Sequence, residues 1–113
     1  MAAANERVMK PTDLTELKAR ASGMATRLKV LSHPERLLML CRMEEGEVSV
    51  NALVELTGLS QSAVSQHLAM LREEGVVATR AEAQTRWYSL HDDTVRAIIH
   101  ALCEICAQQP TAH

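Results

Sequence analysis

Aromatic residues are almost missing from this sequence of 113 residues, which has one tryptophan, one tyrosine and no phenylalanine. Proteins that bind single-stranded nucleic acid stack bases on aromatic side chains, so such a surface is not expected here. Glycine is also scarce, with four residues, and the sequence has no glycine-rich loop that would cradle a phosphate. It also has no Ser/His/Asp or Cys/His constellation with supporting spacing, so we do not expect an enzyme.

The chain has no excess of positive charge. Twelve Lys and Arg residues stand against fourteen Asp and Glu residues, which gives a formal net charge of −2. This balance excludes a basic domain that holds nucleic acid by bulk charge alone. With 47% hydrophobic and 23% charged residues, the composition is that of an ordinary globular protein, and the length fits one domain.

Long apolar segments are missing as well. The longest apolar run, Leu37 to Cys41, has five residues, whereas crossing a bilayer takes roughly 20. Residues 1–10 carry charges and have no apolar core of signal-peptide length, so we expect a cytoplasmic protein without a membrane partner. Three cysteines, an odd number, argue against a secreted disulfide framework, and we expect them to be thiols.

Hydrophobic periodicity predicts one domain over residues 12–107, between a flexible N-terminal tail at 1–11 and a C-terminal tail at 108–113. Helices are expected over residues 12–31, 34–45, 51–57, 60–74 and from 92 onward, with Ser32 and Ser60 as suitable N-caps. Two β-rich runs at 76–79 and 85–90 predict a hairpin, and residues 48–50 suffice only for a bridging strand. The predicted order is α-α-α-α-β-β-α, a mainly α fold with α+β character.

The segment from Val50 to Gly75 has the pattern of a helix-turn-helix, with Gly58 in its turn. From Leu59 to Met70 there is no charged residue. The first half of the second helix instead offers amide, hydroxyl and imidazole groups, which can bind base edges in the major groove of double-stranded DNA. The predicted base-contacting residues are Gln61, Ser62, Ser65, Gln66 and His67.

The hairpin directly after this motif predicts a winged helix-turn-helix. Arg80 and Arg86 flank the tip of the hairpin, and we expect them to contact the DNA backbone or the minor groove. A Ser/Gln-rich helix by itself is also compatible with a merely solvated face. The hairpin beside it favours DNA binding.

Three segments in this order resemble the ArsR/SmtB family of winged-helix repressors: LSHPERL at 31–37, LSQSAVSQHL at 59–68 and AQTRWYSL at 83–90. The similarity covers roughly residues 14–107. It implies a homodimeric repressor, with an interface built mainly from the first and last helices and an inducer that lowers operator affinity. A two-fold dimer presents two recognition helices about 34 Å apart and therefore calls for an inverted-repeat operator.

Two metal sites known in this family are not matched. One is a Cys-x-Cys box, whose counterpart within residues 48–56 contains no cysteine. The other uses Asp and His ligands on the last helix, where Asp92 matches but Thr94 and Ile105 stand in place of histidines. We therefore assign no metal ligand and no cofactor.

The histidines leave one alternative open, because any set of His and Cys side chains can in principle hold zinc. His91 and His100 are nine residues apart on one predicted helix and do not share a face, so we expect them to be solvated or locally hydrogen-bonded. His33 precedes Pro34 and is expected to act as a local cap.

The cysteines lie on two predicted helices, Cys41 on the second and Cys103 and Cys106 near the end of the last. This placement resembles the sulfur- and redox-responsive branch of the family, which includes BigR, SqrR, HlyU and YgaV. In that branch, one thiol on each of these helices becomes bridged by a disulfide or a short polysulfide chain. The resemblance implies that Cys41 is one partner of such a bridge.

The second partner is open between Cys103 and Cys106. Counted from Tyr88, the family's distal cysteine falls at Ala107, one residue beyond Cys106 and one turn beyond Cys103. We slightly favour Cys106, because helical spacing aligns it with the apolar stripe of the last helix and it lies at nearly the expected depth.

The sequence thus predicts a dimeric repressor that is released from operator DNA when Cys41 and Cys106 or Cys103 are bridged by reactive sulfur species or an oxidant. Such a bridge would pin two helices together and shift the recognition helices from their spacing on DNA. A metal- or metalloid-responsive repressor with a cysteine site is the alternative. A third hypothesis is a constitutive regulator or interaction module with structural cysteines.

Overall fold

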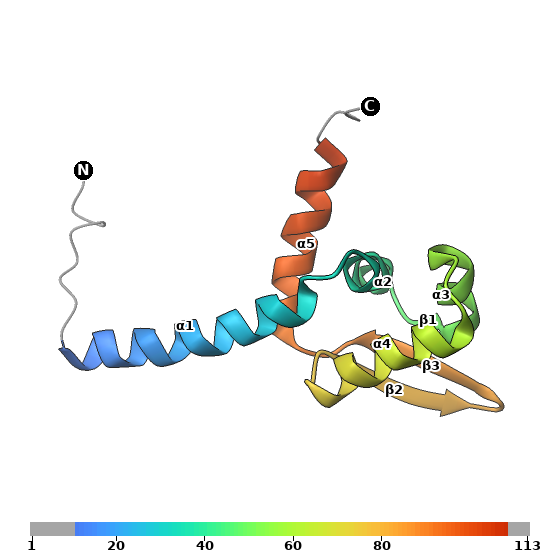
Figure 1. Ribbon diagram of the computed structural model, residues 1–113, viewed down its shortest axis with the longest axis horizontal. Coiled ribbons are helices and arrows are strands. Elements are labelled where there is room, and N and C mark those ends of the chain that lie inside the picture. Colours follow the sequence, from blue (N-terminus) through green and yellow to red (C-terminus); the bar gives the residue numbers. More distant parts are fainter. Residues whose placement is uncertain (1–10, 109–113) are drawn as a thin grey trace.

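The computed structural model describes residues 11–108, and Figure 1 shows five helices and a small sheet in this part. The elements are α1 (Pro11–Leu31), α2 (Pro34–Glu44), β1 (Val48–Ser49), α3 (Val50–Thr57), α4 (Gln61–Glu73), β2 (Val77–Glu82), β3 (Thr85–Leu90) and α5 (Asp93–Gln108). The predicted order of elements is confirmed. The predicted terminal tails lie outside the described residues except for Pro11 and Gln108, the end residues of two helices.

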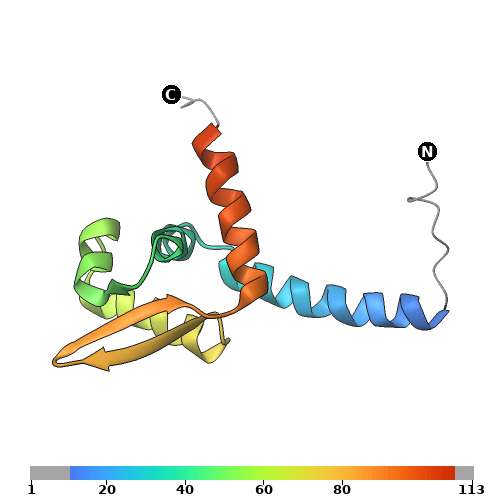
Figure 2. The same ribbon diagram turned by 180° about the vertical axis from the view of Figure 1, so that it is seen from behind.

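The three strands form an antiparallel sheet in the order β1-β3-β2. The predicted bridging strand is β1, whose Val48 pairs with Tyr88 in β3, while Val77 in β2 pairs with Leu90 in β3. Strands β2 and β3 extend together beyond the helices as a wing (Figures 1 and 2). The wing turns at residues 83–84, where Ala83 has a φ of 56°, a left-handed conformation that is uncommon without glycine.

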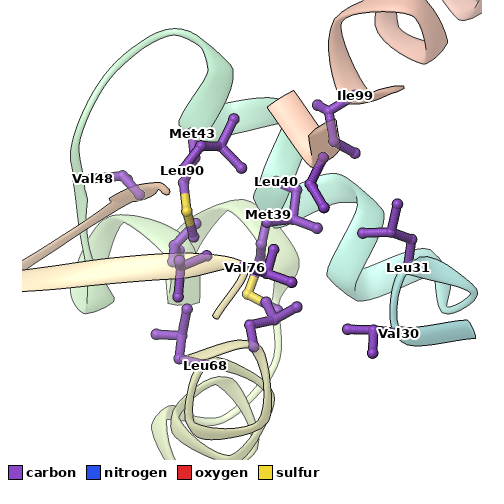
Figure 3. Close-up of a cluster of buried hydrophobic side chains, with 14 of the residues drawn as sticks. Val30, Leu31, Met39, Leu40, Met43, Val48, Leu68, Val76, Leu90 and Ile99 are labelled. Atoms are coloured by element: carbon purple, nitrogen blue, oxygen red, sulfur yellow. The ribbon is translucent and has the colours of Figure 1, made fainter. Parts of the chain in front are cut away.

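Helices α2 to α5 and the sheet enclose one hydrophobic core (Figure 3). The predicted stripe of α4 is confirmed, because Val64, Leu68 and Leu71 are buried. The helical pattern of residues 51–57 predicts that Leu56 points inward, which is wrong: Leu56 is 41% exposed, and Leu38 on α2 is 40% exposed. The fully buried side chains of α2 are instead three others, Met39, Leu40 and Met43.

Helix α1 extends away from the body in both views (Figures 1 and 2). Its last residues, Val30 and Leu31, belong to the core, and Arg27 Nε donates a hydrogen bond to Asp92 Oδ2 at 2.8 Å. Towards its start, Leu14 and Leu17 are each 46% exposed. The described chain therefore anchors α1 at one end and leaves an apolar stripe uncovered.

The helix starts follow the local chemistry of the chain. Ser60 caps α4 as predicted, and its hydroxyl accepts a hydrogen bond from the Ala63 amide at 3.1 Å. The N-cap of α2 is His33 rather than Ser32, and its Nδ1 accepts from the Glu35 amide at 3.1 Å. Among residues 11–108, no helix combines the length and apolar character needed to span a membrane.

Candidate functional site

The turn between α3 and α4 sets the direction of the predicted recognition helix. Gly58 ends α3 in the left-handed conformation, with a φ of 74°, which glycine adopts without steric cost. The Thr57 hydroxyl accepts a hydrogen bond from the Leu59 amide at 3.2 Å, and Ser60 then caps α4. These local contacts hold two short helices in a helix-turn-helix.

The solvent face of α4 carries four of the five predicted base-contacting residues. Gln61, Ser62, Ser65 and Gln66 are exposed, and the apolar stripe on the opposite side is buried. Because α4 is anchored by its core face, its amides and hydroxyls are presented to solvent on a rigid element. This is the arrangement that direct contact with base edges requires.

His67, the fifth predicted residue, is half-buried against α2. Its ring lies edge-on to that of His33 with centroids 4.6 Å apart, and Arg36 Nη1 donates to its Nδ1 at 3.5 Å. Burial, followed by the positive charges of His33 and Arg36, lowers the pKa of His67. The imidazole is thus a neutral interhelical contact, and a role in DNA binding stays a prediction.

The structure holds Arg80, the first predicted backbone contact, in a network of carboxylates. Its guanidinium donates to both oxygens of Glu47, at 2.7 and 2.9 Å, and to Glu82 at 2.7 Å. These hydrogen bonds raise the pKa of Arg80 and lower the pKa of Glu47. Because Glu47 precedes β1, this network ties the β2 strand of the wing to the first strand of the sheet.

Arg86 makes fewer side-chain hydrogen bonds than Arg80. Its Nη1 donates to the hydroxyl of Thr79 at 3.2 Å, and the residue is exposed. It lines a hollow of about 210 Å³ where the starts of α3 and α4 approach the wing tip. The other lining residues are Ser49, Val50, Asn51, Gln61, Gln84 and Thr85, and none of the seven is acidic. Ser49, Asn51 and Gln84 were not predicted for the site, since only the tertiary structure places them beside Arg86.

A second site lies where α5 packs across α2 (Figure 1). The Cys103 thiol donates to the sulfur of Cys41 across a Sγ–Sγ distance of 2.6 Å, and both residues are free and half-buried. Cys106 is exposed. The structure therefore favours Cys103 as the neighbour of Cys41, the reverse of our preference from the sequence.

Cys106 does not contact Cys41 because α5 continues beyond the point where it packs against α2. Helical spacing does align Cys106 with buried Ile99, but α5 extends past α2 (Figures 1 and 2). Residues 104–108 are all exposed, and Ile105 is 51% exposed. Cys103 is the last position of α5 that is packed against the core, and it lies level with Cys41.

A hollow of about 230 Å³ opens beside the thiol pair. Besides the two cysteines it is lined by Leu38, Arg42, Glu44, Glu45 and Leu56. Leu38 and Leu56, both exposed leucines, are thus part of its wall. The hollow reaches the thiol pair from one side.

The surroundings of the pair keep Cys41 protonated. Burial, the hydrogen bond shared with Cys103 and the charges of Cys103, Cys106 and Glu44 raise the pKa of Cys41 to about 12. One turn further along α2, Glu44 Oε2 accepts a hydrogen bond from His100 Nδ1 at 2.5 Å, a contact between two helices rather than a local one. Cys41 therefore lacks the lowered pKa that is typical of a reactive thiol.

The described residues contain no preformed metal site. Among residues 11–108, no group of three or more His, Cys, Asp or Glu side chains is arranged to hold a metal ion. Asp92, the one residue that matches a family metal position, pairs with Arg27 and caps α5 by accepting from the Val95 amide at 3.1 Å.

Comparisons with known proteins agree with this geometry. Residues 33–79 match the model of the family described as "Bacterial regulatory protein, arsR family". The chain is 45% identical over 92 residues to the HTH-type transcriptional regulator YgaV of Escherichia coli K12, covering 80% of this chain and 93% of the relative. It is 40% identical over 98 residues to the biofilm growth-associated repressor of Xylella fastidiosa 9a5c, covering 86% of each. The structure of reduced HlyU from Vibrio cholerae superposes with a TM-score of 0.79 at 41% identity, over 82% of this chain and 98% of that one.

Proposed function

This chain belongs to the arsR family of bacterial regulatory proteins and is a DNA-binding transcriptional regulator rather than an enzyme, and we propose that it is a thiol-responsive repressor. In this proposal a homodimer binds inverted-repeat operator DNA and leaves it when Cys41 and Cys103 become covalently bridged. The observation that carries the proposal is the contact of these two sulfurs between α2 and α5. A relative named as a repressor supports the direction of regulation.

In the DNA-bound state, α4 and the wing make the contacts with DNA. The exposed amides and hydroxyls of α4 contact base edges in the major groove, the most direct of them from Gln66 and Ser62. Arg86 contacts the backbone, because its guanidinium has no carboxylate partner among the described hydrogen bonds. Arg80 serves mainly to hold the wing in place through Glu47.

Dimerisation would bury the apolar side chains that are exposed on α1 and at the end of α5. Leu14, Leu17 and Leu28 on α1 and Ile105 on α5 are each between 46% and 51% exposed. A small domain gains stability by burying such side chains against a second copy. Two copies also present each wing arginine to the DNA twice, so attraction to phosphate comes from placed side chains and not from the net charge, which is −2 per chain.

The bridging reaction needs an oxidising sulfur donor, and a low-molecular-weight persulfide meets this requirement. The thiolate of one cysteine attacks the terminal sulfur of the persulfide, forms a cysteine persulfide and releases the donor thiolate. The second cysteine, as thiolate, attacks the inner sulfur and expels hydrosulfide. The two protein thiols are oxidised to a disulfide, and the transferred sulfur is reduced.

The bridge acts on DNA affinity through geometry. Noncovalent contacts let α2 and α5 adjust against each other, whereas a covalent bond fixes their separation. Helix α2 packs on α3, and α5 belongs to the proposed dimer interface, so a shift between α2 and α5 changes the distance and tilt between the two α4 helices. Affinity for an operator of fixed half-site spacing then falls.

The test combines mass spectrometry with operator binding. We expect a persulfide donor to join Cys41 to Cys103 in the wild-type protein and to weaken operator binding, and we expect Cys41→Ser and Cys103→Ser to retain binding after treatment. Release of either variant to the wild-type extent would overturn thiol sensing. Zinc, cadmium and arsenite in the same assay test the metal-responsive alternative, which predicts stoichiometric binding and loss of operator affinity.

A further inference from the structure

The thiol pair borders the hollow described above, but in its resting state it is poorly disposed to attack a donor. Cys41 is held protonated, and the proton of Cys103 is engaged in the hydrogen bond to Cys41. Both residues are half-buried. Thiol–disulfide chemistry requires a thiolate that can approach the donor sulfur in line. The pair is therefore well placed to close a bridge and poorly placed to begin the reaction.

Cys106 differs from the pair in exposure and is close to it in position. It is exposed on α5, three residues beyond Cys103. Residues three apart on a helix are neighbours, with Cβ atoms about 5–6 Å apart. The charge of Cys106 also contributes to raising the pKa of Cys41.

We propose that Cys106 is the thiol that reacts first and passes sulfur to Cys103. This inference rests on the proposed function and assigns the order of events within it. Cys106 can react first because it is exposed, whereas Cys41 or Cys103 would first have to break the hydrogen bond between them. The substrate is a low-molecular-weight persulfide that meets Cys106 at the surface.

Each step of the relay is a thiolate exchange. The Cys106 thiolate attacks the terminal sulfur of the donor, whose S–S bond breaks, and the donor leaves as a thiolate. The Cys103 thiolate, formed by proton loss to solvent, takes that sulfur and releases the Cys106 thiolate. Cys41 then loses its proton to solvent, and its thiolate attacks the inner sulfur of the Cys103 persulfide and expels hydrosulfide. Cys106 is regenerated, and the disulfide joins α2 to α5.

The relay gains speed because its second step is intramolecular. A donor held on the adjacent turn has a high effective concentration, which favours transfer to the half-buried Cys103 over its reaction with a donor from solution. Replacing Cys106 should therefore slow bridge formation without changing its end point.

The experiment measures the rate of the Cys41–Cys103 bridge by mass spectrometry with glutathione persulfide in limiting amount. We expect Cys106→Ser to slow the reaction by about tenfold or more, and Cys103→Ser to retain one additional sulfur atom on Cys106. The control is the double variant Cys106→Ser/Gln108→Cys, which puts an exposed thiol about 140° around α5 from Cys103 and should stay slow.

The results distinguish failure of the relay from failure of the proposed function. A wild-type rate in Cys106→Ser overturns the relay, and so does full rescue by the control, which would mean that any exposed thiol suffices. A wild-type protein that forms no bridge with the donor overturns the proposed function itself. Retention of sulfur on Cys106 in the Cys103→Ser variant supports the relay, and operator binding by the same variant shows that it is folded.

Discussion

The Nδ1 of His100 lies 2.5 Å from Glu44 Oε2, one turn from the point where Cys103 contacts Cys41. Helices α2 and α5 are thus joined by two contacts in antiparallel order, one ionisable and one oxidisable. A second carboxylate, Glu104, lies 3.8 Å from His100 Nε2. The junction between the two helices therefore places a pH-sensitive contact beside the thiol pair.

The first prediction concerns this pH response. The hydrogen bond to Glu44 and its negative charge raise the pKa of His100 above the ordinary value of 6.5. The contact therefore stabilises the fold fully below pH 6.5, and the gain is lost as the pH rises through the higher folded-state pKa. We expect Glu44→Gln to flatten this part of the pH dependence, measured by urea denaturation at about pH 6 and about pH 8. Glu104→Gln is the matched control with a smaller expected effect, and an unchanged pH dependence in Glu44→Gln would contradict the assignment.

The second prediction concerns base contacts by α4. Gln66→Ala should weaken operator binding by about 1–3 kcal/mol and relax the preference at one base position. The reason is the loss of a paired donor and acceptor from an exposed amide. Titration of operator and random DNA measures both effects, with Gln108→Ala on α5 as the control. Equal losses on the two DNAs would show that Gln66 makes no base-specific contact.

The third prediction separates the two arginines of the wing. Arg86→Gln should weaken binding to all sequences and reduce the slope of log affinity against log salt concentration by about 1 for each phosphate that the side chain no longer neutralises. Arg80→Gln should leave that slope nearly unchanged and lower the melting temperature, since its guanidinium holds Glu47 and Glu82. A larger salt effect from Arg80 than from Arg86 would reverse these roles.

The fourth prediction concerns the apolar face of α1. Leu17 and Leu28 are 46% and 48% exposed, and charges in their place would be buried in a dimer without partners. We expect Leu17→Lys/Leu28→Lys to shift the protein to monomers in sedimentation velocity and to abolish tight operator binding. Lys18→Gln, on the same helix, should leave the dimer intact. A double variant that remains dimeric would place the interface elsewhere.

The helix-turn-helix could be predicted from the sequence because its signals are local. The capping serine at position 60, the left-handed glycine at 58 and the apolar spacing of α4 each act within a turn or two of chain. The same holds for the order of elements and for the bridging strand, which the hydrophobic pattern and the short loop lengths predicted. The family resemblance rested on these same segments.

The partner of Cys41 was decided only by the tertiary structure. The sequence by itself determined that one thiol lies on α2 and two lie near the end of α5. Whether Cys103 or Cys106 lies beside Cys41 depends on how far α5 extends past α2, which is a property of helix packing across 62 positions of chain. The same limit applies to His67 and Arg80, which look free in the sequence because their partners, His33 and Glu47, are distant in it.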